Sequence, residues 1–132
     1  MIYDKTRRQV LAVSPRNARS FLDRLRGMIG RDFADTPFDA MIFERCNAIH
    51  TCGMKIPIDA IFLDRRNRIC RIAGSVPPWR FVMGGSAAVA VIEMAAGKAA
   101  ELGAAAGDEV EFLSVPAADN SSSAGCQEIE KS

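Results

Sequence analysis

The spacing of apolar residues predicts a chain built mainly from β-strands. In "IDAIFLD" (58–64) apolar residues occupy both alternating sets, as is typical of a central strand buried on both faces. "RICRIAGSV" (68–76) alternates less completely and follows the turn residues "RRN" (65–67), so the two segments are predicted to form a hairpin. Shorter runs with the same character predict further strands at 7–13, 39–43, 88–94 and within 105–113.

A helical period appears once near the N-terminus. In "SPRNARSFLDRLRGMIGR" (14–31) the apolar residues recur at helical spacing, Ser14 or Asn17 can cap a helix, and Pro15 suits its first turn. A second, short helix is predicted at 97–103. "PPW" (77–79) interrupts the pattern, and "FVMGGS" (81–86) is expected to be a glycine-rich loop.

The order of these segments favours one fold class. Direct strand-to-strand connections dominate, without the alternation of strands and helices that a parallel sheet requires. We therefore expect a mainly β domain over residues 1–115, namely a small antiparallel β sandwich or barrel with one N-terminal α-helix and a short second helix. The polar, aperiodic segment 116–132 is expected to be a disordered tail.

Charge and apolar content limit the classes of partner that the chain is expected to have. The 132 residues carry 17 basic and 16 acidic side chains, a net charge of +1, which is too weak to favour nucleic acid. No apolar run approaches the roughly 20 residues of a membrane span. The N-terminal residues also lack an uninterrupted apolar run of signal-peptide length, so a cytoplasmic location is expected.

The residues best suited to catalysis or metal binding are concentrated in "CNAIHTCGMKIPIDAIFLD" (46–64). Cys46, His50 and Cys52 could share a metal ion, but the chain has a single histidine and no C-x-x-C pair, so no metal or cofactor is expected. Alternatively, Cys46 could be a nucleophile with His50 as its base, assisted by Lys55 and oriented by Asp59. The structural alternative has both cysteines packed and His50 hydrogen-bonded.

Two further features could bind a partner. Asp59 stands in an apolar strand, so its carboxylate must be paired with an arginine, backbone N–H groups or a ligand. Arg24, Arg26 and Arg31 at the end of the predicted helix could join Lys55 in an anion-binding cluster, or they could simply form a solvated face. Trp79, beside two prolines, could form a contact surface or cover an edge of the core.

Three segments together resemble a known family. "RLRGMIGR" (24–31), "DAMIFERCNAIHTCGMKIPIDAIFLD" (39–64) and "VIEMAAGKAAELGAAAGDEVEF" (91–112) are similar to the bacterial and archaeal family called domain of unknown function 192, in the branch with the pattern IHT-x-GM-x-x-PID. The resemblance implies a mainly β, sandwich-like domain without an established enzymatic activity, and many members are exported or lipid-anchored. Cys52 stands where that branch has an aromatic residue, which weakens both the metal and the thiol interpretations.

The sequence therefore predicts a non-catalytic accessory domain that binds a small anionic ligand or a peptide carboxylate near the 50–59 loop, with the oligomeric state left open. The predicted site residues are His50, Thr51, Lys55, Asp59, Cys46, Arg24 and Arg31. One alternative is a thiol-dependent enzyme with Cys46 as nucleophile and His50 as base. Another is an interaction domain that uses Trp79 and the strand edges.

Overall fold

The structure is a computed structural model that describes residues 1–17 and 38–113. Its elements, in chain order, are β1 (Ile2–Asp4), β2 (Gln9–Ala12), β3 (Pro15–Asn17), β4 (Ala40–Glu44), β5 (Ala48–His50), β6 (Ile58–Leu63), β7 (Ile69–Val76), β8 (Phe81–Met83), β9 (Ala90–Ala95), α2 (Lys98–Leu102) and β10 (Val110–Phe112). The described part is thus mainly β, as the sequence predicts.

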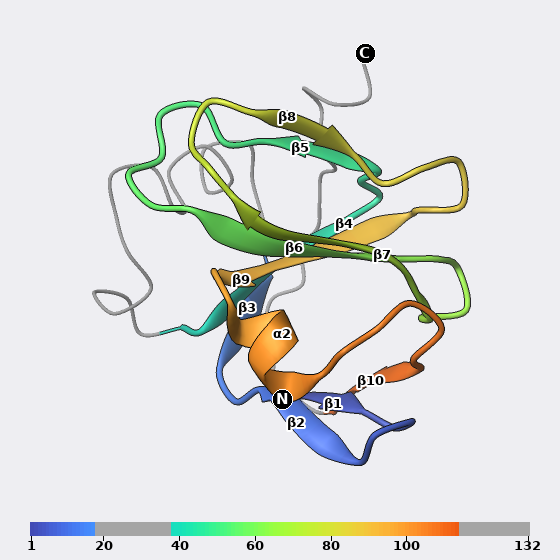
Figure 1. The fold of residues 1–132 in the computed structure, drawn as a ribbon. Coiled ribbons are helices and arrows are strands. Elements are labelled where there is room, and N and C mark those ends of the chain that lie inside the picture. The colour runs from blue at the N-terminus through green and yellow to red at the C-terminus, as the bar shows by residue number, and fades with distance from the viewer. Residues whose placement is uncertain (18–37, 114–132) are drawn as a thin grey trace.

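The strands form three sheets stacked in layers. The middle layer is a five-stranded sheet with the order β3-β4-β9-β6-β7 (Figure 1). The two-stranded sheet β5-β8 lies on one side of it, and the three-stranded sheet β10-β1-β2 lies with helix α2 on the other. The middle sheet is therefore covered on both faces, and it must bury apolar side chains on both.

Strand β6 shows how the sequence meets this demand. All six of its residues are buried, and it lies between β7 and β9. Ile58, Ala60 and Phe62 enter the core under β5 and β8, whereas Ile61 and Leu63 enter the core beside α2. Because side chains alternate along a strand, apolar residues at both parities are needed here. The prediction of a buried central strand is confirmed.

Several other predicted elements are confirmed by the structure. β6 and β7 form an antiparallel hairpin whose turn spans Arg65–Asn67, closed by a hydrogen bond from the Asn67 N–H to the Asp64 carbonyl at 3.0 Å. The predicted strands at 39–43 and 88–94 correspond to β4 and β9, and the predicted short helix corresponds to α2. These elements are buried or regular, so local periodicity identifies them.

The start of the predicted N-terminal helix is wrong. Pro15–Asn17 forms β3, which pairs in parallel with β4 in the register Pro15 to Ala40. Ser14 does not cap a helix. Its N–H donates to the Asp39 carboxylate at 2.8 Å, and its carbonyl accepts the Asp39 N–H at 3.1 Å. Pairing with a segment more than twenty residues away thus overrides the local helical signals, and the rest of the predicted helix, 18–31, lies outside the described residues.

Three finer expectations are also corrected. The sheets are open, so the barrel alternative is wrong. The β3–β4 pair is parallel, so the architecture is not wholly antiparallel. The expected glycine-rich loop at 81–86 begins with strand β8, which pairs with β5. No helix in the described ranges is long and apolar enough to cross a membrane.

Gly84 is required where β8 leaves its sheet. A Cβ atom at this position would lie 2.3 Å from Cδ1 of the buried Phe62 ring and 2.8 Å from Cβ of Ala88. We predict that Gly84→Ala lowers the free energy of unfolding by about 2–3 kcal/mol, because the core must shift to admit the methyl group. Urea unfolding measures this. The matched change Gly74→Ala, whose Cβ would meet only Asp59 Oδ1 at 3.8 Å, should cost much less. Equal losses would contradict the packing argument.

Candidate functional site

Thr51 fastens one surface loop to the end of β5. Its side chain is buried, and its hydroxyl donates to the Pro77 carbonyl at 2.7 Å and accepts the Arg80 N–H at 2.9 Å. The Thr51 backbone adds two bonds, since its N–H donates to the Arg80 carbonyl and its carbonyl accepts the Trp79 N–H at 3.0 Å. The hydroxyl predicted as a ligand group is therefore used to hold the loop 77–80.

Trp79 is held in an unusual backbone conformation by these bonds. Its φ is +65°, a region that a bulky side chain rarely adopts. Such a conformation costs free energy and persists only where the surroundings fix it, as the four bonds to Thr51 do here. Trp79 is nevertheless 67% exposed, so a loop whose backbone is fixed presents a large aromatic residue to solvent.

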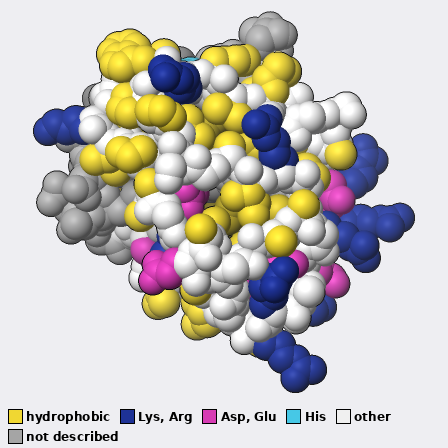
Figure 2. All heavy atoms as spheres, in the orientation of Figure 1, with side chains coloured by type: hydrophobic (Ala, Val, Ile, Leu, Met, Phe, Trp, Pro, Cys, Tyr) yellow, Lys and Arg dark blue, Asp and Glu magenta, His cyan; other side chains and the backbone are white. Residues whose placement is uncertain are grey.

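Strand β8 continues this exposed surface. Phe81 and Met83 are each 52% exposed, whereas Val82 between them packs against the core. We define Trp79, Phe81 and Met83 as the Trp79 surface. Hydrophobic side chains gather over the upper part of the face in Figure 2, where Figure 1 places β5 and β8. The apolar run "FVM" (81–83) is the sequence signal that could have indicated a strand here, and side chains alternate along a strand, so Phe81 and Met83 would then share one face.

Asp59 has a complete set of internal partners. Its side chain is 1% exposed, and Oδ1 accepts the N–H groups of Ser75 (2.8 Å) and Gly97 (3.0 Å), while Oδ2 accepts that of Ala99 (2.8 Å). Gly97 and Ala99 begin α2, so Asp59 caps this helix from a neighbouring strand. Of the partners considered from the sequence, backbone N–H groups are the ones that the structure shows.

His50 and Asp59 lie on opposite sides of the middle sheet. Asp59 points toward α2, whereas His50 ends β5 in the opposite layer. Nδ1 of His50 accepts the Cys52 N–H at 3.3 Å, so a neutral ring carries its hydrogen on Nε2. Asp59 therefore does not orient His50, because the two side chains lie on opposite sides of the middle sheet.

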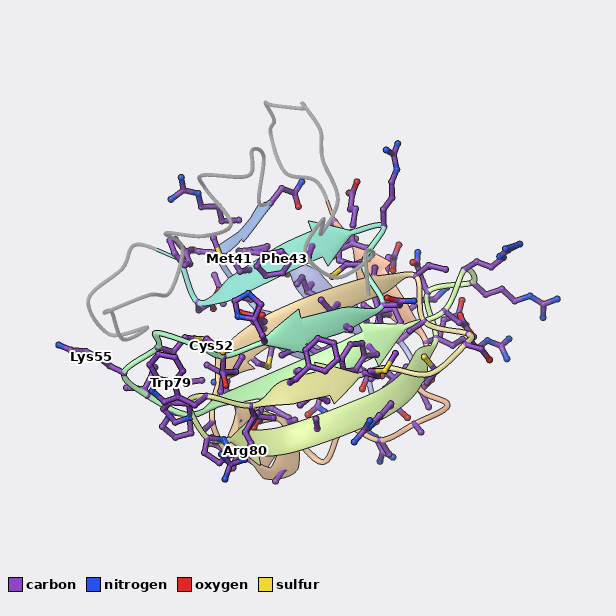
Figure 3. All side chains as sticks on the ribbon, turned by 90° about the horizontal axis from the view of Figure 1, so that it is seen from above. Met41, Phe43, Cys52, Lys55, Trp79 and Arg80 are labelled. Atoms are coloured by element: carbon purple, nitrogen blue, oxygen red, sulfur yellow. The ribbon has the colours of Figure 1, made fainter. Side chains whose placement is uncertain are left out.

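The remaining predicted residues occupy different environments. Cys46 is 3% exposed within the core under β5 and β8, and its sulfur, which is disulfide-bonded, lies 3.1 Å from the Ala48 carbonyl oxygen. Lys55 is exposed at the same end of the molecule as Cys52 and Trp79 (Figure 3). Arg24, Arg26 and Arg31 lie outside the described residues. Within 1–17 and 38–113, no three His, Cys, Asp or Glu residues cluster as metal ligands.

A separate ionisable cluster joins the three-stranded sheet to the turn before β10. Arg7 Nε donates to Asp108 Oδ2 at 2.7 Å, and the Arg7 N–H donates to Asp4 Oδ1 at 3.1 Å. Burial and a hydrogen bond to Asp108 raise the pKa of Asp4. Burial opposes ionisation of Asp108, but hydrogen bonds from Asp4 and Arg7 outweigh it and lower the pKa of Asp108. Asp4 therefore holds a proton more readily than Asp108, and Asp108 forms the ion pair with Arg7.

Comparison with known protein families gives a match over most of the chain. The family model of DUF192, described as "Uncharacterized ACR", matches residues 3–112. The chain belongs to the DUF192 family. The sequence resemblance is thereby confirmed at the level of the family, whose description names no activity.

Two solved structures resemble this DUF192 chain. A protein of unknown function from Novosphingobium aromaticivorans DSM 12444 is 28% identical, with a TM-score of 0.64 and 74% of each chain covered. A Sinorhizobium meliloti 1021 protein, described as a proposed transcription regulator, is 23% identical, with a TM-score of 0.62 over 72% of this chain and 78% of that one. The second likeness shows the shared fold alone. The search of curated proteins finds no match.

The role of Asp59 can be tested by removing its charge. In Asp59→Asn, one oxygen is replaced by an NH2 group that faces backbone N–H groups, so we expect a loss of about 3 kcal/mol in unfolding free energy. Chemical denaturation measures it. Asp64→Asn is the control, because Asp64 also accepts two N–H groups, from Arg66 and Arg68, but in a solvent-exposed turn. A loss at Asp59 no larger than at Asp64 would refute the structural role.

The reactivity of Cys46 tests the enzyme alternative. Because Cys46 is buried, we expect iodoacetamide to modify it much more slowly than the exposed Cys52 in the reduced, folded protein at neutral pH. Peptide mass spectrometry reads both sites in one sample, and unfolding should equalise the two rates. Faster modification of Cys46 than of Cys52 would indicate an activated thiolate and revive the nucleophile hypothesis.

Proposed function

We propose that the protein is a non-catalytic accessory domain, within residues 1–115, that binds a protein or peptide partner through the Trp79 surface. The observation that supports this most directly is the exposed indole of Trp79 on a loop fixed by the buried Thr51. Strained backbone that is held in place by its surroundings is frequent at binding sites, and the backbone of Trp79 is of this kind.

The physical advantage of such a loop is preorganisation. A tryptophan contributes a large contact area, and it is enriched among the residues that dominate binding energy at interfaces. When its backbone is already fixed, less conformational entropy is lost upon association. Phe81 and Met83 extend the apolar area next to it, and they are exposed on the same face of β8.

The polar site predicted from the sequence takes a secondary place in this proposal. Thr51 and Asp59 use their side chains internally, which leaves Lys55 and the Nε2 hydrogen of His50 as available donors. His50 is the last residue of β5 and Lys55 follows that strand, and β5 is the strand that pairs with β8. We propose that they form part of a polar rim around the Trp79 surface, where they could contact a carboxylate of the partner. No observation favours the thiol-enzyme alternative.

The role of Trp79 can be tested with a selection from a displayed peptide library. The wild-type protein is expected to select binding peptides that Trp79→Ala does not bind, whereas Trp79→Phe should retain part of the affinity. Because the indole is mostly exposed, Trp79→Ala should change the stability by less than about 0.5 kcal/mol.

Since Trp79 is the single tryptophan of the chain, its fluorescence gives a second readout. The selected peptides should shift its emission to shorter wavelength and protect residues 77–86 from proteolysis. Selection of no binders, or of binders that retain full affinity for Trp79→Ala, would overturn the proposed function.

A further inference from the structure

The register between β5 and β8 leaves one edge of β8 open. In an antiparallel pair, hydrogen-bonded and non-bonded residue pairs alternate. Gly84 donates to the Asn47 carbonyl and Thr51 donates to the Arg80 carbonyl, so the bonded pairs are 47–84, 49–82 and 51–80. The backbone groups of Phe81 and Met83 must then point away from β5. Arg71 confirms this direction, because its guanidinium donates to the Met83 carbonyl from that side.

The geometry points to this edge of β8 as the docking site for an extended peptide strand in which acidic and apolar residues alternate. This inference rests on the proposed function and names the partner's chemistry and conformation. In the described part of the chain, β8 pairs with β5 alone. The N–H and C=O of Phe81 and the N–H of Met83 are placed to pair with such a strand, as in other cases of strand addition to a sheet edge.

Side chains on this edge match the alternation of an added strand. Phe81 and Met83 are exposed on one face, two residues apart. In a strand paired beside them, every second side chain would stand on that same face, at the spacing at which cross-strand pairs interact. The partner therefore needs apolar residues at alternate positions, and Trp79 extends the contact beyond the end of the strand.

The positive charge around the open edge of β8 indicates which residues should stand at the other positions of the peptide. Residues 46–58 and 71–89 contain Lys55, Arg71 and Arg80 and no acidic residue. Lys55 and Arg80 are labelled near Trp79 in Figure 3, and the Asp and Glu side chains visible in Figure 2 lie lower on that face. Charges of one sign steer and stabilise a partner of the opposite sign, so acidic residues should occupy the remaining positions of the peptide.

Two other partners would meet parts of this surface less well. A second copy of the chain would bring the same cations together, and like charges at an interface oppose association. An anionic membrane would satisfy the cations and the aromatic residues but would offer no strand to pair with the N–H and C=O of Phe81 and the N–H of Met83. The open backbone edge is thus the feature that favours a peptide.

The experiment measures fluorescence anisotropy of a labelled peptide EVEVEVE at low ionic strength. Because β8 offers three residues for pairing, we expect weak binding, with a Kd on the order of 100 μM. The peptide EVEPEVE, in which proline removes a backbone donor, should bind at least tenfold more weakly, and KVKVKVK should not bind. Added salt should weaken the binding of EVEVEVE, since the contacts involve exposed charges.

Variants of the protein test the edge and the charges separately. Met83→Pro removes an N–H that points away from β5, a position where edge strands tolerate proline, and it should weaken binding about tenfold or more. The double variant Lys55→Glu with Arg80→Glu leaves the backbone unchanged and should weaken binding to a similar extent. Arg8→Glu, an exposed change in the turn between β1 and β2, is the matched control and should bind normally.

The outcomes separate this inference from the proposed function. If peptides that depend on Trp79 bind Met83→Pro and the charge variant normally, the strand-docking inference fails and the proposed function stands. If no peptide binds through Trp79, both fail. Binding to phosphatidylglycerol vesicles that Met83→Pro leaves unchanged, without binding of EVEVEVE, would assign the surface to a membrane and overturn the inference. A concentration-dependent dimer abolished by Met83→Pro would assign it to a second copy.

Discussion

The carboxylate of Asp59 is the interaction on which the described architecture depends most. From the buried strand β6 it accepts N–H groups at the end of β7 and at the start of α2, so one side chain joins the β6–β7 hairpin to a helix about forty residues further along the chain. Helix α2 is only five residues long and has no side-chain cap of its own. A helix this short is marginal in isolation, so its start is stabilised by this external acceptor and by the burial of Ala99.

The segment 75–80 connects the hydrogen bonds of Asp59 to those of Thr51, on the side of the middle sheet where β5 and β8 lie. Ser75, which donates to Asp59, has a φ of +47° and lies at the end of β7, two residues before Pro77. The Pro77 carbonyl accepts the hydroxyl of Thr51, and Thr51 in turn holds Trp79 and Arg80. Two buried polar residues from the same sequence stretch thus fix both ends of the 75–80 segment. The exposed position of Trp79 is a consequence of buried hydrogen bonds on either side of it.

Sequence periodicity predicted the elements that the core defines. β6, β7, β9 and α2 follow from local patterns, because their residues are buried or regularly placed. The start of the predicted helix at Ser14 was wrong, and so was the first half of the loop predicted at 81–86, because β3 and β8 owe their conformation to partners distant in sequence. The same limit applies to the site. Backbone partners for Asp59 could be anticipated from a carboxylate in an apolar strand, but the carbonyl groups that Thr51 engages could not.

The stretch from Cys46 to Asp59 contains reactive residue types for reasons of folding. The connection between β4 and β5 packs into the core, where Cys46 supplies a small buried side chain. Segments whose backbone groups lack a sheet partner need buried acceptors and donors, and Asp59 and Thr51 supply these. Once those demands are met, His50 and Lys55 are the predicted site residues of this stretch whose polar groups are left as available donors. The Trp79 surface faces solvent near them, and it is on this surface that the proposed binding function rests.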